Sequence, residues 1–235
     1  MINFSKLDRP PAAENWVRMQ HRGVDKTALK MFNFLRGGPI WNYNSSKVAV
    51  KSRIEHRIDL STAQKIVTRS GSKLGRPYNL DVVNAFFDYE KENPIDGVQA
   101  FDDMYERFPL SRQVSIPIKP LTVVREGKSF VPYFLCPWSS VNLTDYQARL
   151  LFTIVEKSIF TLTDFEDSDG KFLFFPKVKN QFGHEERKPM VWSRGQFPLL
   201  SDKELAEQIK IYFGAKPIAK NLYIEFLKRK EEQSS

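Results

Sequence analysis

A helix with almost no polar surface is the feature that most constrains the fold of this chain. Thr144-Asp-Tyr-Gln147 has the spacing of a capping box, in which the Thr and Gln side chains bond the free donors of the first helical turn. Most of the residues that follow, up to Leu162, are apolar, and the polar residues Arg149, Thr153, Glu156 and Lys157 fall on one narrow stripe at helical spacing. Such a helix is largely buried. We therefore predict a core helix over 145–162, around which the second half of the chain is built.

Several short strands are predicted around that helix. Phe130-Val-Pro-Tyr-Phe-Leu135 is an extended, aromatic-rich run, and Arg125-Glu-Gly-Lys128 before it has the composition of a hairpin turn. Prolines within the strands favour edge or bulged positions. Residues 177–188 are predicted to form a polar loop. Four further strands are predicted, at 114–118, 121–124, 171–176 and 190–192.

Helices are predicted at both ends of the chain. A second capping box, Ser201-Asp-Lys-Glu204, begins a helix expected to end at Gly214, and a last helix is expected over 218–230. Asn79 is predicted to cap another helix. The N-terminal helices are predicted at 12–21, 26–35, 47–57, from 60 onward, from 79 to about 92, and at 97–108.

These elements predict an α+β fold, with a helical N-terminal region followed by a small, mostly antiparallel sheet with packed helices. We place the boundary near Pro109, so that residues 1–110 form a helical region with a basic face. Residues 111–235 form an α+β region built round the helix at 145–162.

The composition is that of a globular protein, because 41% of the 235 residues are hydrophobic and 27% are charged. No window approaches the ~18 uninterrupted apolar residues of a membrane span, and the N-terminus lacks the apolar core of a signal peptide. The single cysteine, Cys136, excludes an internal disulfide and fits a reducing compartment. We therefore expect a cytoplasmic protein without a membrane partner. Its net charge of +8 favours anionic partners.

A charge step divides the helical region. Residues 44–79 carry eight basic and two acidic side chains, a net charge of +6, whereas residues 80–110 carry two basic and eight acidic ones, a net charge of −6. The first segment can contact phosphates, and we predict the nucleic-acid-binding residues there to be its eight cations: Lys47, Lys51, Arg53, Arg57, Lys65, Arg69, Lys73 and Arg76. In the alternative interpretation, the acidic segment folds back on the basic one.

Two further patterns bear on nucleic acid. Short helices separated by a glycine turn have the element order of a helix-turn-helix unit, although the helix in the recognition position is acidic. Gly75-Arg76-Pro77 resembles the core of the AT-hook, a minor-groove element, but Leu74 stands where that motif has a basic residue. A second basic stretch, 171–194, interleaves lysines with aromatic residues that could stack on single-stranded bases.

Signatures of catalysis are sparse. Asp169 and Glu186-Arg-Lys188 have a spacing similar to that of PD-(D/E)xK nucleases, in which two acids hold Mg²⁺. The sequence contains no P-loop, no Gly-x-Gly-x-x-Gly and no Gly-x-Ser-x-Gly. The three histidines have no ligand partner at zinc spacing, and Cys136 has the surroundings of a packed core residue.

We therefore predict a non-enzymatic, regulatory nucleic-acid-binding protein that needs no metal or other cofactor. One alternative is a protein–protein adaptor or regulatory subunit whose charged faces pair with a partner. A second is a metal-dependent nuclease that uses Asp169, Glu186 and Lys188.

Overall fold

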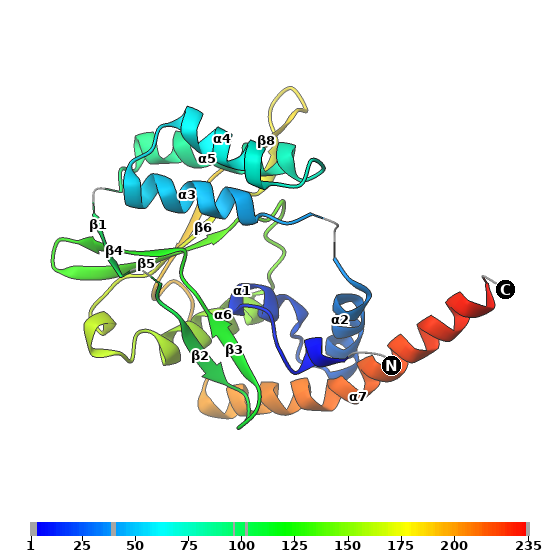
Figure 1. Ribbon diagram of the computed structural model, residues 1–235. Helices are drawn as coiled ribbons and strands as arrows, with labels where there is room; N and C mark the ends of the chain where they lie inside the picture. The colour runs from blue at the N-terminus through cyan, green and yellow to red at the C-terminus, as the bar shows by residue number, and fades with distance from the viewer. Residues whose placement is uncertain (1–3, 39–40, 96, 102, 234–235) are drawn as a thin grey trace.

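Figure 1 shows a computed structural model of the protein, which describes residues 4–38, 41–95, 97–101 and 103–233. The described residues form seven α-helices: α1 (Ala13–Trp16), α2 (Val24–Arg36), α3 (Asn44–His56), α4 (Leu60–Ser70), α5 (Arg76–Glu92), α6 (Asp145–Ser158) and α7 (Asp202–Glu232). They form nine strands: β1 (Val98–Phe101), β2 (Glu106–Pro109), β3 (Ser115–Ile118), β4 (Thr122–Glu126), β5 (Ser129–Cys136), β6 (Lys171–Phe174), β7 (Lys177–Lys179), β8 (Glu185–Arg187) and β9 (Met190–Ser193). Three short 3₁₀ turns are η1 (Ser5–Leu7), η2 (Val17–Met19) and η3 (Thr163–Phe165). The predicted α+β class is confirmed.

The main sheet has five strands in the order β1-β4-β5-β6-β9. Neighbouring strands are antiparallel except β5 and β6, which run parallel and are connected through α6. A parallel pair needs such a crossover because the chain must return to the same end of the sheet. The strands β2 and β3 form a separate two-stranded ribbon, and so do β7 and β8.

Strand β5 is buried on both faces of the sheet, so its apolar run is nearly continuous. Val131, Tyr133 and Leu135 belong to one hydrophobic cluster with α3, α4 and α5, whereas Phe134 and Cys136 belong to the other with α1, α2, α6 and α7. Successive side chains of a strand point to opposite faces, which explains this division. Figure 1 shows the resulting layers, with α3–α5 on one side of the sheet and the other helices on the opposite side.

The N-terminal helices are therefore shared between the two faces, because α3–α5 cover one and α1 and α2 contribute to the other. Each hydrophobic cluster contains residues from both sides of position 110. The division into regions 1–110 and 111–235 stays a prediction.

The predicted core helix is confirmed as α6. Its capping box is formed, since the backbone N–H of Gln147 donates to Thr144 Oγ1 at 3.3 Å and the N–H of Thr144 donates to Gln147 Oε1 at 2.9 Å. Gln147 Nε2 also donates to the carbonyl of Gln20 at 2.8 Å, which ties the start of α6 to the N-terminal segment. The helix ends at Ser158 rather than at Leu162.

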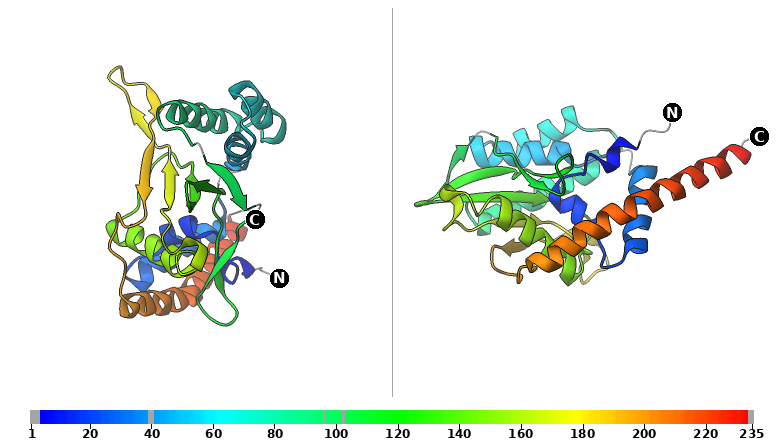
Figure 2. Two further views of the ribbon diagram at one scale, coloured as in Figure 1. Left: turned by 90° about the vertical axis from the view of Figure 1, so that its left-hand side faces the viewer. Right: turned by 90° about the horizontal axis from the view of Figure 1, so that it is seen from below.

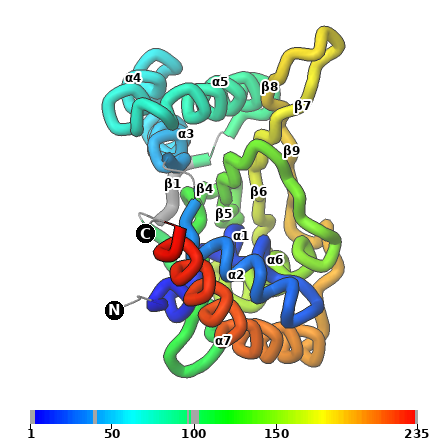
Figure 3. The backbone as a smooth tube through the Cα atoms, turned by 90° about the vertical axis from the view of Figure 1, so that its right-hand side faces the viewer, coloured from blue at the N-terminus to red at the C-terminus, as the bar shows by residue number. Residues whose placement is uncertain are grey.

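The C-terminal helix is longer than predicted. The capping box of Ser201 and Glu204 is confirmed, but α7 continues through Gly214 and Pro217 as one helix. The reason is its packing on α2, beside which it lies in Figure 3: Gly214 faces Val24, and Ala215 and Ala219 are fully buried. Burial of this face offsets the intrinsic cost of glycine and proline in a helix, about 1 and about 3 kcal/mol.

The prediction of a helix at 97–108 is wrong, because the described residues there form β1 and β2. Val98 pairs with Arg125 of β4, and Phe108 pairs with Ile116 of β3. The helical spacing of Phe101, Met104 and Phe108 misled the prediction, because these strands are determined by pairing with β4 and β3 rather than by spacing within the segment. The acidic residues Asp96 and Asp102 of this segment lie outside the described residues.

The prediction of a polar loop at 177–188 is also wrong in part, since this segment contains the hairpin of β7 and β8. Its turn includes Gly183 at φ +80°, a conformation that glycine adopts without steric cost. Figure 2 shows this hairpin extending away from the sheet, beside the layer of α3–α5.

Asn79 is not a helix cap, because α5 begins three residues earlier, at Arg76. Its side chain is buried and bonds three backbone groups: it accepts from the N–H of Ser46 at 2.9 Å and donates to the carbonyls of Asn42 and Gly75 at 2.9 and 2.8 Å. Asn79 thus fixes the start of α5 against the segment that leads into α3.

Candidate nucleic-acid interface

The eight cations predicted to contact phosphate separate into two groups. The α3 group lies on or directly after that helix and contains Lys47, Lys51, Arg53 and Arg57. The turn group lies on α4, in the α4–α5 turn and at the first residue of α5, and contains Lys65, Arg69, Lys73 and Arg76.

The two arginines of the α3 group are paired with one buried carboxylate. Arg53 Nε donates to Glu90 Oε2 at 2.7 Å, and Arg57 Nη1 lies 3.7 Å from Glu90 Oε1. Arg53 also donates to the carbonyl of Ile58 at 2.9 Å and stands 5.2 Å from the ring centroid of Phe87. These contacts join α3 to α5 and pair both guanidinium groups with the buried Glu90 carboxylate.

The two lysines of the α3 group also face acids. Lys47 Nζ lies 3.4 Å from Glu14 Oε1, and Lys51 Nζ lies 3.4 Å from Asp103 Oδ1 and 3.7 Å from Glu55 Oε1. Together with Glu90, Asp103 brings part of the acidic segment onto α3. The alternative in which the acidic segment folds back on the basic one therefore describes α3 well.

Replacing Glu90 with glutamine is expected to lower the free energy of unfolding by about 2 kcal/mol, because the two arginines lose their charged partner while the side-chain shape is kept. Urea unfolding measures the change. Glu92→Gln is the matched control, since Glu92 is exposed at the last residue of α5, and it should stay within about 0.5 kcal/mol of the wild type. Equal stability of the two variants would contradict a structural role for the Glu90 pair.

The turn group is more open to solvent. Lys65, Arg69 and Lys73 are exposed, and none of them forms an ion pair with another described residue. Lys65 and Arg69 stand one helical turn apart on α4, so both project from the same face. Arg76 differs, because it is half-buried and its Nη2 donates to the carbonyl of Thr68 at 2.8 Å. Arg76 thus stabilises the turn that carries Lys73.

Two aromatic rings stack beside this turn. Trp41 and Tyr78 lie with ring centroids 4.4 Å apart and an interplanar angle of 2°. Gly75 allows this approach, because a Cβ there would lie 2.9 Å from Cβ of Trp41. Trp41 is half-buried and Tyr78 is exposed, with 37% of its surface accessible. We call Trp41, Lys65, Arg69, Lys73 and Tyr78 the α4–α5 patch.

The hairpin of β7 and β8 brings the second basic stretch to the edge of this patch. Lys177 Nζ stands 5.5 Å from the ring centroid of Tyr78 and 4.0 Å from Asp81 Oδ2. Arg187 anchors the hairpin, since its Nη2 donates to Tyr43 Oη at 3.1 Å and its guanidinium stands over the same ring. The hairpin tip exposes Phe182, which has 74% of its surface accessible.

Sequence reasoning identified the cations of the patch but missed the stack. Trp41 and Tyr78 are far apart along the chain, and the contacts of Gly75 with Trp41 and of Asn79 with Asn42 bring their segments together. Gly75-Arg76-Pro77, which resembles the AT-hook core, forms the N-cap and first turn of α5.

The residues of the nuclease hypothesis are not brought together. Asp169 lies before β6 and accepts from the N–H groups of Gly170 and Arg194 at 2.7 and 3.2 Å. Glu186 lies in the hairpin that follows β6 and pairs with Lys188 at 3.2 Å. The two acids are thus at opposite ends of that strand. Within the described part of the chain, no three His, Cys, Asp or Glu side chains gather at metal-binding distance.

Two buried titratable groups elsewhere, Cys136 and Tyr133, are held in their neutral form. Complete burial raises the pKa of the Cys136 thiol well above its usual value, so it stays protonated and is a poor nucleophile. Burial and the neighbouring Glu126 carboxylate raise the pKa of Tyr133, whose hydroxyl donates to Glu126. Lys171 Nζ joins this cluster at 3.1 Å from Glu126 Oε2. These groups hold β4, β5 and β6 together.

Comparison with known proteins gives no further guidance, since no protein-family model, curated protein or solved structure matches the chain. Among the described helices, none combines the length and the apolar character needed to cross a bilayer.

Proposed function

We propose that the protein binds single-stranded nucleic acid without acting on it, through the α4–α5 patch. The observations that carry this proposal are the Trp41–Tyr78 stack beside the α4–α5 turn and the exposed cations Lys65, Arg69 and Lys73, which form no ion pair with another described residue. Aromatic faces stack on unpaired bases, and neighbouring cations contact the phosphates between them. The half-exposed rings and the exposed cations supply these two kinds of contact.

Unpaired strands suit this surface better than duplex DNA. In a helix-turn-helix unit, the second helix enters the major groove and presents its side chains to base edges. Here α5 holds that position, but Val82, Val83 and Phe86 bury one face of it on the sheet. Its open face carries Asp81 and Asp88, which a phosphate backbone would repel. We therefore expect the strand to run over the turn rather than along α5.

Replacing Trp41 with alanine is expected to weaken binding to a labelled single-stranded oligonucleotide by roughly 5- to 150-fold, since one stacked base contributes about 1–3 kcal/mol. Fluorescence anisotropy measures the dissociation constant, and thermal unfolding verifies that the variant is folded.

Tyr105→Ala is the control for loss of an exposed aromatic residue, because Tyr105 lies next to β2 and has 45% of its surface accessible. Its affinity should match that of the wild type. If the Trp41 variant is folded and binds as tightly as the Tyr105 variant, stacking on the patch is excluded.

A further inference from the structure

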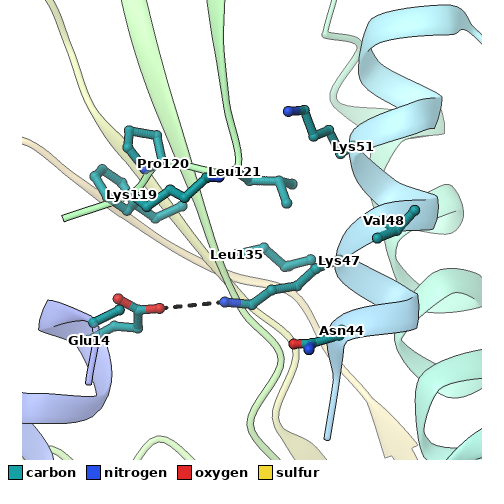
Figure 4. A pocket seen from close by; sticks show the side chains of 11 residues that line it. Glu14, Asn44, Lys47, Val48, Lys51, Lys119, Pro120, Leu121 and Leu135 are labelled. Atoms are coloured by element: carbon teal, nitrogen blue, oxygen red, sulfur yellow. Dashed lines mark hydrogen bonds and ion pairs between the residues drawn. The ribbon is translucent and has the colours of Figure 1, made fainter. Parts of the chain in front are cut away.

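A pocket of about 410 Å³ opens between α1, the first half of α3, the segment before β4 and the end of β5. Figure 4 shows its side chains converging from these four elements. The volume falls in the range of about 300–1,000 Å³ that is typical of small-ligand sites. Asn44, the first residue of α3, also lines the pocket, whereas neither Trp41 nor Tyr78 of the α4–α5 patch is among its lining residues.

The floor of the pocket is apolar. Phe134 and Leu135 line it from β5 and are almost fully buried, while Pro120 and Leu121 line it from the segment before β4. Val48 stands at the mouth and has 52% of its surface exposed, unusual for a valine on a helix that packs on a sheet. A flat apolar group placed between Val48 and this floor would remove these surfaces from water.

The rim of the pocket carries three ammonium groups, from Lys47, Lys51 and Lys119. Two of them share one anion, because Asp103 Oδ1 lies 3.4 Å from Lys51 Nζ and 3.2 Å from Lys119 Nζ. The Asp103 side chain is itself 68% exposed, and it is held there by these two lysines, which lower its pKa. The carboxylate thus marks a position at which the lysines bind an oxyanion, and an exposed acid can be displaced from it.

A buried carboxylate completes the site. The side chain of Glu14 has only 7% of its surface exposed, and its Oε1 lies 3.4 Å from Lys47 Nζ. Its other oxygen, Oε2, has no partner among the described residues, so it remains able to accept a hydrogen bond. Figure 4 shows the carboxylate directed towards the pocket from α1. A ligand with an N–H donor on its apolar body would satisfy it.

We propose that this pocket binds a nucleoside 5′-monophosphate group, with the base on the apolar floor, a base N–H donating to Glu14, and the phosphate between Lys51 and Lys119 in place of the Asp103 carboxylate. A phosphate monoester carries a charge of about −1.5 to −2 at neutral pH, so it attracts the two ammonium groups more strongly than one carboxylate does. The group is either a free mononucleotide or the 5′-phosphorylated end of a strand. Binding of the free nucleotide does not depend on the α4–α5 patch.

Isothermal titration calorimetry with AMP, adenosine and inorganic phosphate, at constant ionic strength, tests the proposal. AMP should bind more tightly than either fragment, because only AMP fills both halves of the site. Lys119→Met should weaken AMP binding about tenfold, and Asp103→Asn should strengthen it about threefold by removing the competing carboxylate. Lys128→Met removes the same charge from the exposed β4–β5 turn and should leave the affinity unchanged.

The two sources of the phosphate are separated by competition with a short oligonucleotide that carries either a 5′-phosphate or a 5′-hydroxyl. Displacement of AMP by the phosphorylated oligonucleotide alone identifies a strand end as the occupant, whereas no displacement by either identifies the free nucleotide. The proposal is overturned if AMP does not bind, or if it binds with the same affinity to the wild type and to the Lys119 and Asp103 variants. Thermal unfolding of both variants excludes misfolding as the cause of a loss.

Discussion

A variant in which Lys65, Arg69 and Lys73 are all replaced with glutamine is expected to bind single-stranded nucleic acid at least about tenfold more weakly at low salt. Each phosphate contact to a single strand contributes about 0.7 to the slope of log affinity against log salt concentration. Loss of three contacts should therefore flatten that slope by about 2. Fluorescence anisotropy at several salt concentrations measures both quantities, and the exposure of the three side chains means that the fold should be unaffected.

The matched control replaces three exposed lysines elsewhere, Lys26, Lys30 and Lys203, with glutamine. Both triple variants lower the net charge from +8 to +5, so they differ only in where the charge is removed. The control should keep a salt slope close to that of the wild type. Equal losses of affinity in the two variants would mean that net charge, rather than the α4–α5 patch, governs binding.

Replacing Phe172 with alanine is expected to lower the free energy of unfolding by about 3–5 kcal/mol. Phe172 is 1% exposed and stacks on Phe134, with ring centroids 4.4 Å apart and an interplanar angle of 7°. Phe152 of α6 packs against it at 5.1 Å. The truncation would leave a cavity where β5, β6 and α6 meet, at the crossover that organises the main sheet.

Urea unfolding followed by circular dichroism measures this loss. Phe182→Ala removes the same side chain from the exposed hairpin tip and should change the unfolding free energy by less than about 0.5 kcal/mol. A Phe172 variant as stable as the Phe182 variant would show that the β5–α6–β6 unit is not the core of the fold.

The elements that the sequence predicted correctly are those specified by local patterns. Thr144 with Gln147 and Ser201 with Glu204 are close in sequence, so their capping boxes could be recognised and are confirmed. The strand β1 could not be recognised in this way, because its backbone partners are in β4. The helix that begins after Ser201 was predicted to end at Gly214, but it continues as α7 because the contact of Gly214 with Val24 outweighs local helix propensity.

The same distinction holds for the candidate site. The excess of cations in residues 44–79 is visible in the sequence, but which of them are paired depends on the fold. Glu90 binds Arg53 because α5 packs against α3, whereas Lys65 of α4 forms no ion pair with another described residue. The Trp41–Tyr78 stack and the pocket beside Lys119 are formed by segments that are distant in sequence, so no local pattern predicts them.

Binding of the wild-type protein to labelled single-stranded DNA, single-stranded RNA and duplex DNA, measured by fluorescence anisotropy over a series of salt concentrations, tests the central claim most directly. We expect micromolar or tighter binding to single strands at low salt, weaker binding to the duplex, and a negative log–log salt slope of at least about 2. Absence of binding to all three probes at low salt would contradict the claim. The basic and acidic segments of the charge step would then serve to pack against each other. The hypothesis of an adaptor that binds a protein partner would replace that of nucleic-acid binding.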